Sequence, residues 1–515
     1  MIENAVPIIP FLTVIFVTLL SGQVQKGLLI GIVVGVWLLS AGSLYTFFQL
    51  FFSQINDQIA NKDSWFLYLF LIALPSLIEL FLKTGSAQAF AQRMTRKIKT
   101  KRGIELAAVA SSFCLSIDDY LSILTTGQVL RSLTDTVGIP RVKLAYLIHA
   151  LSGTVVILMP LSSWVATLTS YLTASGIGKN DIIASDPFTV YLYSMPHTMY
   201  SILTIMTVLF IVLKRISFGP IKQAEKDETP QQIFHGNEPV SHTAKTVHLF
   251  GPLLLLIGLI VCLILFQNDA ALFGGSRSIF QAFKHNTDIF FILAVASSTT
   301  FVLTSLYFWQ TGMLSAFDCL HAIKNSFGLM YNVLFIIFLL SIFSHLARND
   351  LKTGAFLATI AQTYVSTGLM PLIFFLTSLA IAFSTGTSWG TFGLLLPIGI
   401  PMLLKLHNIE TAVESSQIPL LYQTIGAIFS GALCGDHLSL FSETTAMSAA
   451  AAQVTAEQHF KTQLAYAMPV VFGCIIYFAS VGFFAHTWHS LAYPLCFGLS
   501  ATVNLGLIMF LKKRW

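Results

Sequence analysis

The sequence predicts an all-α polytopic membrane protein made of two inverted-topology repeats, each with a re-entrant hairpin and a broken helix. Composition, the length of the apolar segments and an internal repeat predict this fold. Of the 515 residues, 55% are hydrophobic and 10% are charged, and the mean hydropathy is +0.76. Soluble globular proteins carry about 25% charged residues. Because a spanning helix needs about 20 mostly apolar residues, the chain supplies about ten to thirteen spans and little room for an extramembrane enzyme.

The basic character of the chain indicates membrane topology rather than nucleic-acid binding. The net charge is +5 and the pI is about 8.8, but excess Lys and Arg in a membrane protein mark cytoplasmic loops. The six cysteines lie in apolar stretches without CxxC spacing, so we expect small core residues and neither a disulfide framework nor a metal site. The first apolar stretch, residues 8–20, lacks a basic n-region and a small-residue cleavage site, so we expect a retained helix.

Hydropathy divides the chain into apolar segments separated by mostly short polar stretches. The segments cover residues 6–20, 27–52, 64–82, 103–130, 141–173, 188–214, 248–267, 287–308, 318–345, 355–406, 418–455, 462–486 and 490–511. One long polar stretch, residues 215–247, is rich in charged residues and proline, which is typical of a linker. We therefore expect a first transmembrane repeat at 1–214, a cytoplasmic linker at 215–247, a second repeat at 248–486, and an extra C-terminal helix with a basic tail at 487–515.

The distribution of Lys and Arg predicts the orientation. If residues 103–130 form a hairpin that enters and leaves on one side, most basic residues fall on one face, together with the linker and the C-terminal Lys512, Lys513 and Arg514. By the positive-inside rule this face is cytoplasmic and the N-terminus is outside. A single crossing at 103–130 would instead leave one basic cluster outside. We expect a multi-pass protein of a prokaryotic inner membrane.

An internal repeat relates the two halves of the chain. The tetrapeptide that begins at Leu82 recurs at Leu351, and the same offset places Asp118 on Thr387. In the expected topology the segment before the first break runs inward and residues 318–345 run outward, so the halves are inverted copies. Inverted repeats with interrupted helices are typical of secondary transporters, whose sites lie near the middle of the membrane. The alternative is a gene duplication with a structural role only.

Four polar interruptions lie inside apolar segments, two in each half. They cover residues 116–122, 160–164, 385–391 and 435–445. The first and third belong to the predicted hairpins 103–130 and 371–406, and the others to the predicted broken helices 141–173 and 418–455. A break frees backbone carbonyls and points helix ends at one spot, so it can coordinate a small cation.

Three aspartates in these breaks are the sharpest candidates for ion and proton binding: Asp118, Asp119 and Asp436. A carboxylate in a medium of low dielectric is costly unless it binds a cation or takes a proton, and either event is a transport step. The alternative is that these aspartates only cap helix N-termini. Further candidate ligands are the hydroxyl residues Ser162, Ser163, Thr387, Ser388, Ser439 and Thr444.

Other polar residues near the breaks allow two interpretations. His437 either relays protons or has a structural role, and Glu443 is either part of a relay or a residue of the cytoplasmic rim. We expect His149 to be a packed, hydrogen-bonded histidine. Trp164 and Trp389 are expected to pack the breaks rather than contact a substrate.

At these breaks the sequence resembles the NhaC-type Na+/H+ antiporter family. Residues 117–120 (IDDY) are similar to its F-D-D-Y motif, and residues 144–146 with 160–164 (LAY and PLSSW) to its K-L-A-Y and P-I-S-T-W stretch. Residues 386–391 match G-T-S-W-G-T, and residues 435–437 with 442–445 resemble G-D-H and S-D-T-T. The chain departs from the family pattern at four polar or breaker positions: Ser122, His149, Leu440 and Glu443.

The resemblance implies a secondary active transporter that exchanges a monovalent cation, Na+ or Li+, for protons at a carboxylate site in the middle of the membrane. The alternative is a cation- or proton-coupled transporter of a small organic acid or amino acid. We expect no cofactor, no transition metal and no enzymatic activity, since no HExxH, GxSxG or comparable signature occurs. The expected partners are the cation, the proton and membrane lipid, with a second copy of the chain allowed and nucleic acid excluded.

Overall fold

A computed structural model describes residues 7–21, 23–95, 98, 100–160, 162–178, 181–226, 245–269, 271–277, 289–364, 366–487 and 489–515. These residues form helices and connecting turns, with isolated β-bridges and no named strand among them. The all-α fold class is therefore confirmed. Most of the predicted linker, residues 227–244, lies outside the described residues, as do Arg96, Lys97, Lys99 and Leu161.

Nine helical spans of the described residues, three of them including an adjoining short helix, are long and apolar enough to cross a membrane, which supports an integral multi-pass protein. The main helices of these spans are α4 (Lys62–Thr84), α11 (Met199–Lys214), α13 (Val247–Gln267), α15 (Ile289–Gln310), α16 (Ala316–His345), α18 (Met370–Thr385), α19 (Ser388–Leu406), α22 (Ala456–Thr487) and α23 (His489–Arg514). This number is below the predicted range because hydropathy does not distinguish a full crossing from two half-crossings.

Shorter helices complete the described chain. They are α1 (Ile9–Ser21), α2 (Val24–Leu39), α3 (Leu44–Ala60), α5 (Ser86–Thr95), α10 (Pro187–Ser194), α12 (Gly219–Lys226) and α17 (Thr353–Tyr364). The predicted apolar segment 27–52 is wrong as a single element, because α2 ends at Leu39 and α3 begins at Leu44. Between them Ala41 and Gly42 have φ values of 50° and 82°, a conformation that ends a helix.

The four predicted interruptions are confirmed as helix breaks. The hairpins consist of α6 (Lys101–Cys114) with α7 (Asp119–Val137) and of α18 with α19. The broken helices consist of α8 (Arg141–Val156) with α9 (Ser163–Ala174) and of α20 (Leu421–His437) with α21 (Glu443–Ala452). The predicted register aligns Asp118 with Thr387, and each of these residues is the N-cap of the second helix of its hairpin.

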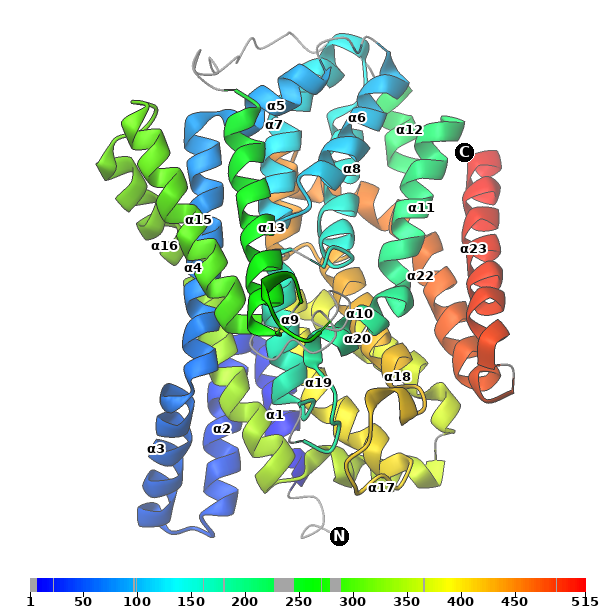
Figure 1. Cartoon of the computed structure of the whole chain (residues 1–515). Coiled ribbons are helices and arrows are strands. Elements are labelled where there is room, and N and C mark those ends of the chain that lie inside the picture. The colour runs from blue at the N-terminus through cyan, green and yellow to red at the C-terminus, as the bar shows by residue number, and fades with distance from the viewer. Residues whose placement is uncertain are drawn as a thin grey trace.

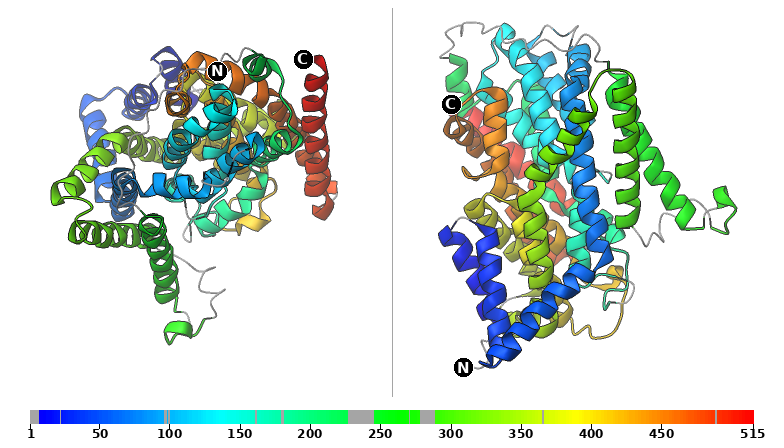
Figure 2. Two further views of the ribbon diagram at one scale, coloured as in Figure 1. Left: turned by 90° about the horizontal axis from the view of Figure 1, so that it is seen from above. Right: turned by 90° about the vertical axis from the view of Figure 1, so that its left-hand side faces the viewer.

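The two hairpins lie toward opposite ends of the molecule. Figure 1 shows α6 and α7 in the upper half and α18 and α19 in the lower half, with the N- and C-termini also toward opposite ends. The side view in Figure 2 shows the same separation of the termini. This arrangement is consistent with inverted halves, and the inverted relation itself stays a prediction.

Small residues let the second hairpin pack closely against its broken helix. A Cβ atom at Gly431 would collide with the carbonyl oxygen of Phe375, and one at Gly435 with that of Leu379. Such glycines allow two helix backbones to approach within a membrane. The Ser378 hydroxyl also donates to the carbonyl of Ile428 over 2.7 Å, so α18 and α20 are fixed together.

The prediction that the cysteines are core residues is only partly confirmed. All six are free thiols, and Cys434, Cys474 and Cys496 are buried as expected for core residues. Cys114 and Cys262 are instead exposed on the surface of their helices. Hydropathy could not separate these positions, because lipid-facing and core-facing residues are equally apolar in a membrane helix.

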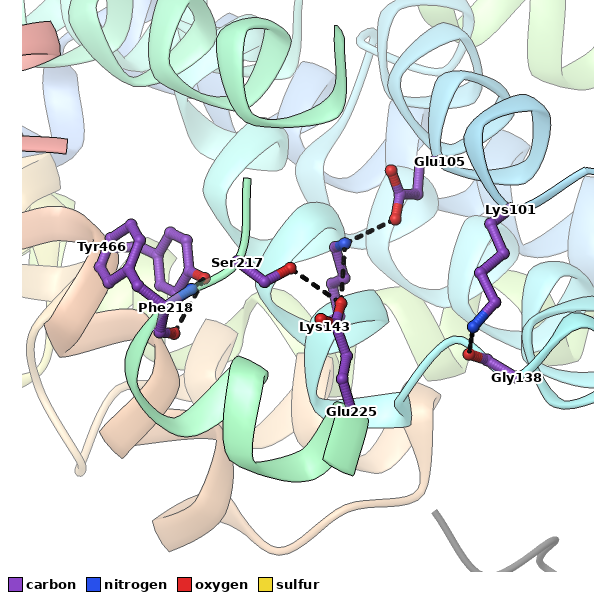
Figure 3. Close-up of polar contacts among 8 residues, drawn as sticks. All are labelled: Lys101, Glu105, Gly138, Lys143, Ser217, Phe218, Glu225 and Tyr466. Atoms are coloured by element: carbon purple, nitrogen blue, oxygen red, sulfur yellow. Dashed lines mark hydrogen bonds and ion pairs between the residues drawn. The ribbon is translucent and has the colours of Figure 1, made fainter. Parts of the chain in front are cut away.

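The described start of the predicted linker folds back onto the helices (Figure 3). Lys143 Nζ lies 2.7 Å from Glu105 Oε1 and 3.3 Å from Glu225 Oε1, so it joins α8 to both α6 and α12. The ring of Phe218 stacks on Tyr466 at a centroid distance of 4.0 Å. The Tyr466 hydroxyl also accepts from the backbone N–H of Phe218 over 2.9 Å and donates to its carbonyl over 3.1 Å. Residues 216–226 are thus attached to α8 by the ion cluster and to α22 by Tyr466.

We predict that Lys143→Gln destabilises the protein strongly. The side chains of Lys143 and Glu105 are only 7% and 6% exposed, and the substitution leaves a buried carboxylate without its cation, at a cost of about 3–5 kcal/mol. Thermal unfolding of the purified protein in detergent measures this loss. The matched control is Lys461→Gln, since the Lys461–Glu457 pair is 62% and 70% exposed and an exposed pair contributes at most about 1 kcal/mol. Equal effects of both substitutions would contradict the prediction.

Candidate functional site

Each hairpin tip lies against a break of the broken helix that follows it in the chain. At the first, the backbone N–H of Ser163 donates to the carbonyl of Ile117 over 2.7 Å. At the second, Gly386 has a φ of 68°, and a Cβ there would lie 2.8 Å from the carbonyl carbon and oxygen of Phe441. These contacts bring the polar residues of the breaks together although they are far apart in the sequence.

Asp118 caps the N-terminus of α7. Its Oδ1 atom accepts from the backbone N–H of Leu121 over 3.0 Å, and the residue is 5% exposed. The helix cap on which the alternative interpretation rests is therefore present at this aspartate. One cap bond leaves further lone pairs of the carboxylate free for a cation or a proton.

Asp119 faces a small pocket beside the paired tryptophans. It is 4% exposed, and Trp164 Nε1 donates to its Oδ1 over 3.3 Å. The ring of Trp164 packs on Trp389 at 4.6 Å, so both tryptophans pack the breaks as expected, and both also line the pocket. The pocket is lined by Phe70, Leu71, Leu74, Pro75, Asp118, Asp119, Tyr120, Ser163, Trp164, Thr167, Met330, Val333 and Trp389.

Asp436 is held by two hydroxyl groups at the second broken helix. It is 7% exposed, and it accepts from Ser442 Oγ over 2.8 Å and from Thr444 Oγ1 over 3.0 Å. The two hydroxyl oxygens lie 2.7 Å apart. Ser442 is the N-cap of α21 and Thr444 is in its first turn, so the break itself places both donors.

The three aspartates lie close enough to interact electrostatically. The charges of Asp118 and Asp436 both act on Asp119, and within the described chain no Lys or Arg forms an ion pair with any of the three. In the same part of the chain, no group of three His, Cys, Asp or Glu side chains is placed to share one metal ion. One cation would therefore use one or two carboxylates together with hydroxyl and carbonyl oxygens.

The candidate hydroxyl residues differ in how free their oxygens are. The buried Oγ atoms of Ser162 and Ser163 have no hydrogen-bond partner among the described residues. Ser388 Oγ is 3.2 Å from the carbonyl of Ala432, and Ser439 Oγ accepts from the backbone N–H of Phe441 over 3.3 Å. Thr387 is the N-cap of α19 without a side-chain cap bond. Ser163 is the one that also lines the pocket.

The two candidate relay residues have different surroundings. His437 is 2% exposed, and its Nδ1 atom lies 3.2 Å from the hydroxyl of Tyr200. Glu443 is exposed and accepts from the hydroxyl of Tyr120 over 3.1 Å. The exposure of Glu443 agrees with the rim interpretation.

Sequence reasoning did not propose Ser442 and His459 as site residues, and it expected His149 to be a packed, hydrogen-bonded histidine, which the structure shows. Ser442 belongs to a recognised motif, so its position was available. His149 Nε2 lies 3.1 Å from Thr444 Oγ1, and His149 Nδ1 lies 2.8 Å from His459 Nε2. The departure of His149 from the acidic residue of the family pattern was a signal for it. Nothing in the local sequence marks His459.

Interrupted helices that place buried carboxylates and hydroxyls within a bundle of membrane-spanning helices define a secondary transporter. The model of the Na+/H+ antiporter family matches residues 155–483, more than half of the sequence. The chain belongs to this family, as the NhaC-type resemblance predicted.

Individual proteins are also similar to this chain in sequence or in fold. An uncharacterized protein of Haemophilus influenzae is 28% identical over 517 residues, which cover 98% of this chain and 95% of that protein. The malate-2H(+)/Na(+)-lactate antiporter of Bacillus subtilis is 36% identical over 117 residues, 22% of this chain and 23% of that protein. The crystal structure of the Alcanivorax borkumensis YdaH transporter has a similar fold, with a TM-score of 0.55, 15% sequence identity, and coverage of 87% of this chain and 90% of that one.

We predict that Gly386→Ala displaces the hairpin tip from the break at Phe441 and impairs transport. The substitution adds a Cβ to a residue at positive φ and also forces it against backbone atoms. The matched control is Gly42→Ala, where φ is 82° and nothing lies within 4 Å. The control is destabilised only by the cost of a Cβ atom at positive φ, about 1–2 kcal/mol. Apparent Tm and transport rate in proteoliposomes measure both variants, and an unimpaired Gly386→Ala protein would contradict the contact.

Proposed function

We propose that the protein is a Na+/H+ antiporter that exchanges a monovalent cation for protons at the buried carboxylates. In one state the cation binds Asp119 and Asp118 with oxygens of the breaks. In the other state protons replace it. Because a proton on the buried carboxylates removes negative charge that attracts the cation, each ion leaves before the other binds, and the two fluxes are coupled.

The observation that carries this proposal is the set of three buried aspartates without a buried cation beside them. A buried carboxylate lacking a counter-charge is costly, and it lowers that cost by binding a cation or a proton. The pocket at Asp118 and Asp119 contains no Lys or Arg among its lining residues. A site of this charge favours a cationic substrate over an anionic one.

The helix N-termini at the site support the same conclusion. The N-terminus of a helix attracts anions, but the start of α7 is already capped by the carboxylate of Asp118. The start of α21 is capped by the hydroxyl of Ser442, and Asp436 accepts from the hydroxyls of Ser442 and Thr444. These ends therefore have side-chain partners within the protein and do not need an anionic substrate.

The proposed orientation follows from the basic residues. Arg131 lies in the second half of α7, and Arg141 and Lys143 lie in the first turn of α8. Figure 1 shows α5, α7, α8 and α12 in the upper part of the molecule. The positive-inside rule places that end in the cytoplasm. The C-terminus lies toward the same end, and the N-terminus lies toward the other.

We predict that Asn at Asp118, Asp119 or Asp436 lowers Na+-driven proton flux by about tenfold or more, since loss of a charged ligand costs more than about 1.4 kcal/mol. The substitution keeps the size of the side chain and removes its charge. A pH-sensitive dye inside proteoliposomes reports the flux after a Na+ pulse.

The matched control for these three variants is Asp57→Asn, because Asp57 is exposed on α3. Its flux is expected to stay within about twofold of the unsubstituted protein, as for most surface substitutions. Unchanged flux in all three buried variants would reject the carboxylate site.

A second candidate function is the coupled exchange of small organic acids. The observation in its favour is the local similarity to the Bacillus subtilis malate-2H(+)/Na(+)-lactate antiporter. An organic carboxylate would need a positively charged partner or a free helix N-terminus, and the pocket lining supplies no Lys or Arg.

We therefore predict that malate and lactate, supplied on either side of the membrane, do not change the Na+-driven proton flux. The measurement is the same dye assay with equal ionic strength maintained by a chloride salt. Flux that is absent with Na+ alone and begins when malate or lactate is added would instead establish the second function.

A further inference from the structure

A continuous line of hydrogen bonds leads from Asp436 to the first turn of α22. Thr444 Oγ1 lies 3.0 Å from Asp436 Oδ2, His149 Nε2 lies 3.1 Å from Thr444 Oγ1, and His459 Nε2 lies 2.8 Å from His149 Nδ1. We name these four residues the histidine chain. These residues come from α20, α21, α8 and α22, so the histidine chain exists only in the folded protein.

When Asp436 is ionised, the number of available hydrogens determines which atom donates and which accepts at each bond of the histidine chain. Ser442 and Thr444 both donate to the carboxylate, so the oxygen of Thr444 must accept from His149 Nε2–H. His149 Nδ1 then carries no hydrogen and accepts from His459 Nε2–H. Every donor points toward Asp436, and this leaves His459 Nδ1 as an acceptor.

The outer end of the histidine chain is an unpaired nitrogen near the surface. His459 Nδ1 and Gln463 Oε1 are buried atoms without a hydrogen-bond partner among the described residues, and they lie one turn apart on α22. Two such polar atoms suit an ordered water. The side chains of Glu457 and Lys461, two residues before and after His459, are 70% and 62% exposed, so this first part of α22 reaches the surface of the protein.

No carboxylate forms an ion pair with either histidine within the described chain. His149 has the ring of His437 at 4.5 Å, from α20, and that of His459 at 4.9 Å, from α22. The other titratable groups nearby are Tyr200, which bonds His437, and Tyr146, whose ring lies 4.8 Å from that of Tyr466. The ion cluster of Lys143, Glu105 and Glu225 lies further toward the start of α8. Apart from Asp436 at the inner end of the histidine chain, a proton on either histidine therefore has no counter-charge to hold it there.

We propose that the histidine chain conducts protons between Asp436 and the end of the molecule where α22 begins. This inference rests on the proposed exchange and adds its proton path. A proton from water binds His459 Nδ1, and the Nε2 proton of His459 passes to His149 Nδ1. The Nε2 proton of His149 passes to Thr444 Oγ1, and the hydroxyl proton of Thr444 passes to Asp436 Oδ2. One proton enters, one is bound by the carboxylate, and both histidines stay neutral with the hydrogen now on Nδ1. The reverse steps return the hydrogens to Nε2 when a proton leaves Asp436 for water.

The path differs from the relay expected from the sequence. His437 is next to Asp436 in the chain, yet its Nδ1 atom is bonded to Tyr200 and its ring only packs on His149. Glu443 bonds Tyr120 at the exposed start of α21. Neither His437 nor Glu443 connects Asp436 to the outer end of the histidine chain.

His459→Gln and His459→Phe test the path at the residue furthest from the aspartates. Both are expected to slow Na+-driven proton flux by about tenfold or more, since neither side chain can pass a proton between two ring nitrogens. Na+ binding, measured as the rise of apparent Tm with added Na+, is expected to stay as in the unsubstituted protein. The matched control is His197→Gln, because His197 is a largely buried histidine bonded to Tyr477 over 2.6 Å outside the chain, and its flux is expected within about twofold.

Normal proton flux in both His459 variants would overturn the path. Loss of Na+ stabilisation together with flux would also overturn it, because His459 would then only support the structure. Failure of the proposed exchange is a separate result, visible in the unsubstituted protein as an absence of Na+-driven proton flux. Rescue of the flux in His459→Ala by added imidazole would support the path, since a structural role does not depend on a mobile base.

Discussion

The cost of a charged carboxylate in a medium of low dielectric governs this structure. Asp118, Asp119 and Asp436 are almost fully buried, and the described chain provides no basic side chain beside them. Their partners are a backbone N–H, an indole N–H and two hydroxyls. Neutral donors reduce the cost of the charge without cancelling it, so the proposed site has affinity for a cation or a proton.

The helix breaks supply these donors and hold them in place. A continuous helix uses its backbone N–H groups internally, whereas each break starts a new N-terminus with free donors. The contacts of Ser163 with Ile117 and of Gly386 with Phe441 fix the hairpin tips against these breaks. Close packing at Gly431 and Gly435 then fixes α18 on α20. The same interruptions that weaken individual helices thus position the site.

The carboxylates have two kinds of surroundings. Asp119 and Asp118 line a pocket with Ser163 and the paired tryptophans, whereas Asp436 connects to hydroxyls and histidines. In the proposed mechanism the pocket binds the cation and the histidine chain brings the proton. Because the charge on Asp436 also acts on Asp119, the arrival of a proton at one weakens the attraction for a cation at the other.

The sequence by itself determined the membrane class, the all-α fold, the four helix breaks and the family, because composition, apolar segment length and short motifs are local properties. It also identified the three aspartates. It misjudged the segment 27–52, since hydropathy does not register a turn between two apolar helices. Only the tertiary structure decided that His149 contacts Thr444 and His459. It also decided that Glu443 is not part of the histidine chain. These contacts join helices distant in sequence, and the packing that brings them together leaves no periodic pattern along the chain.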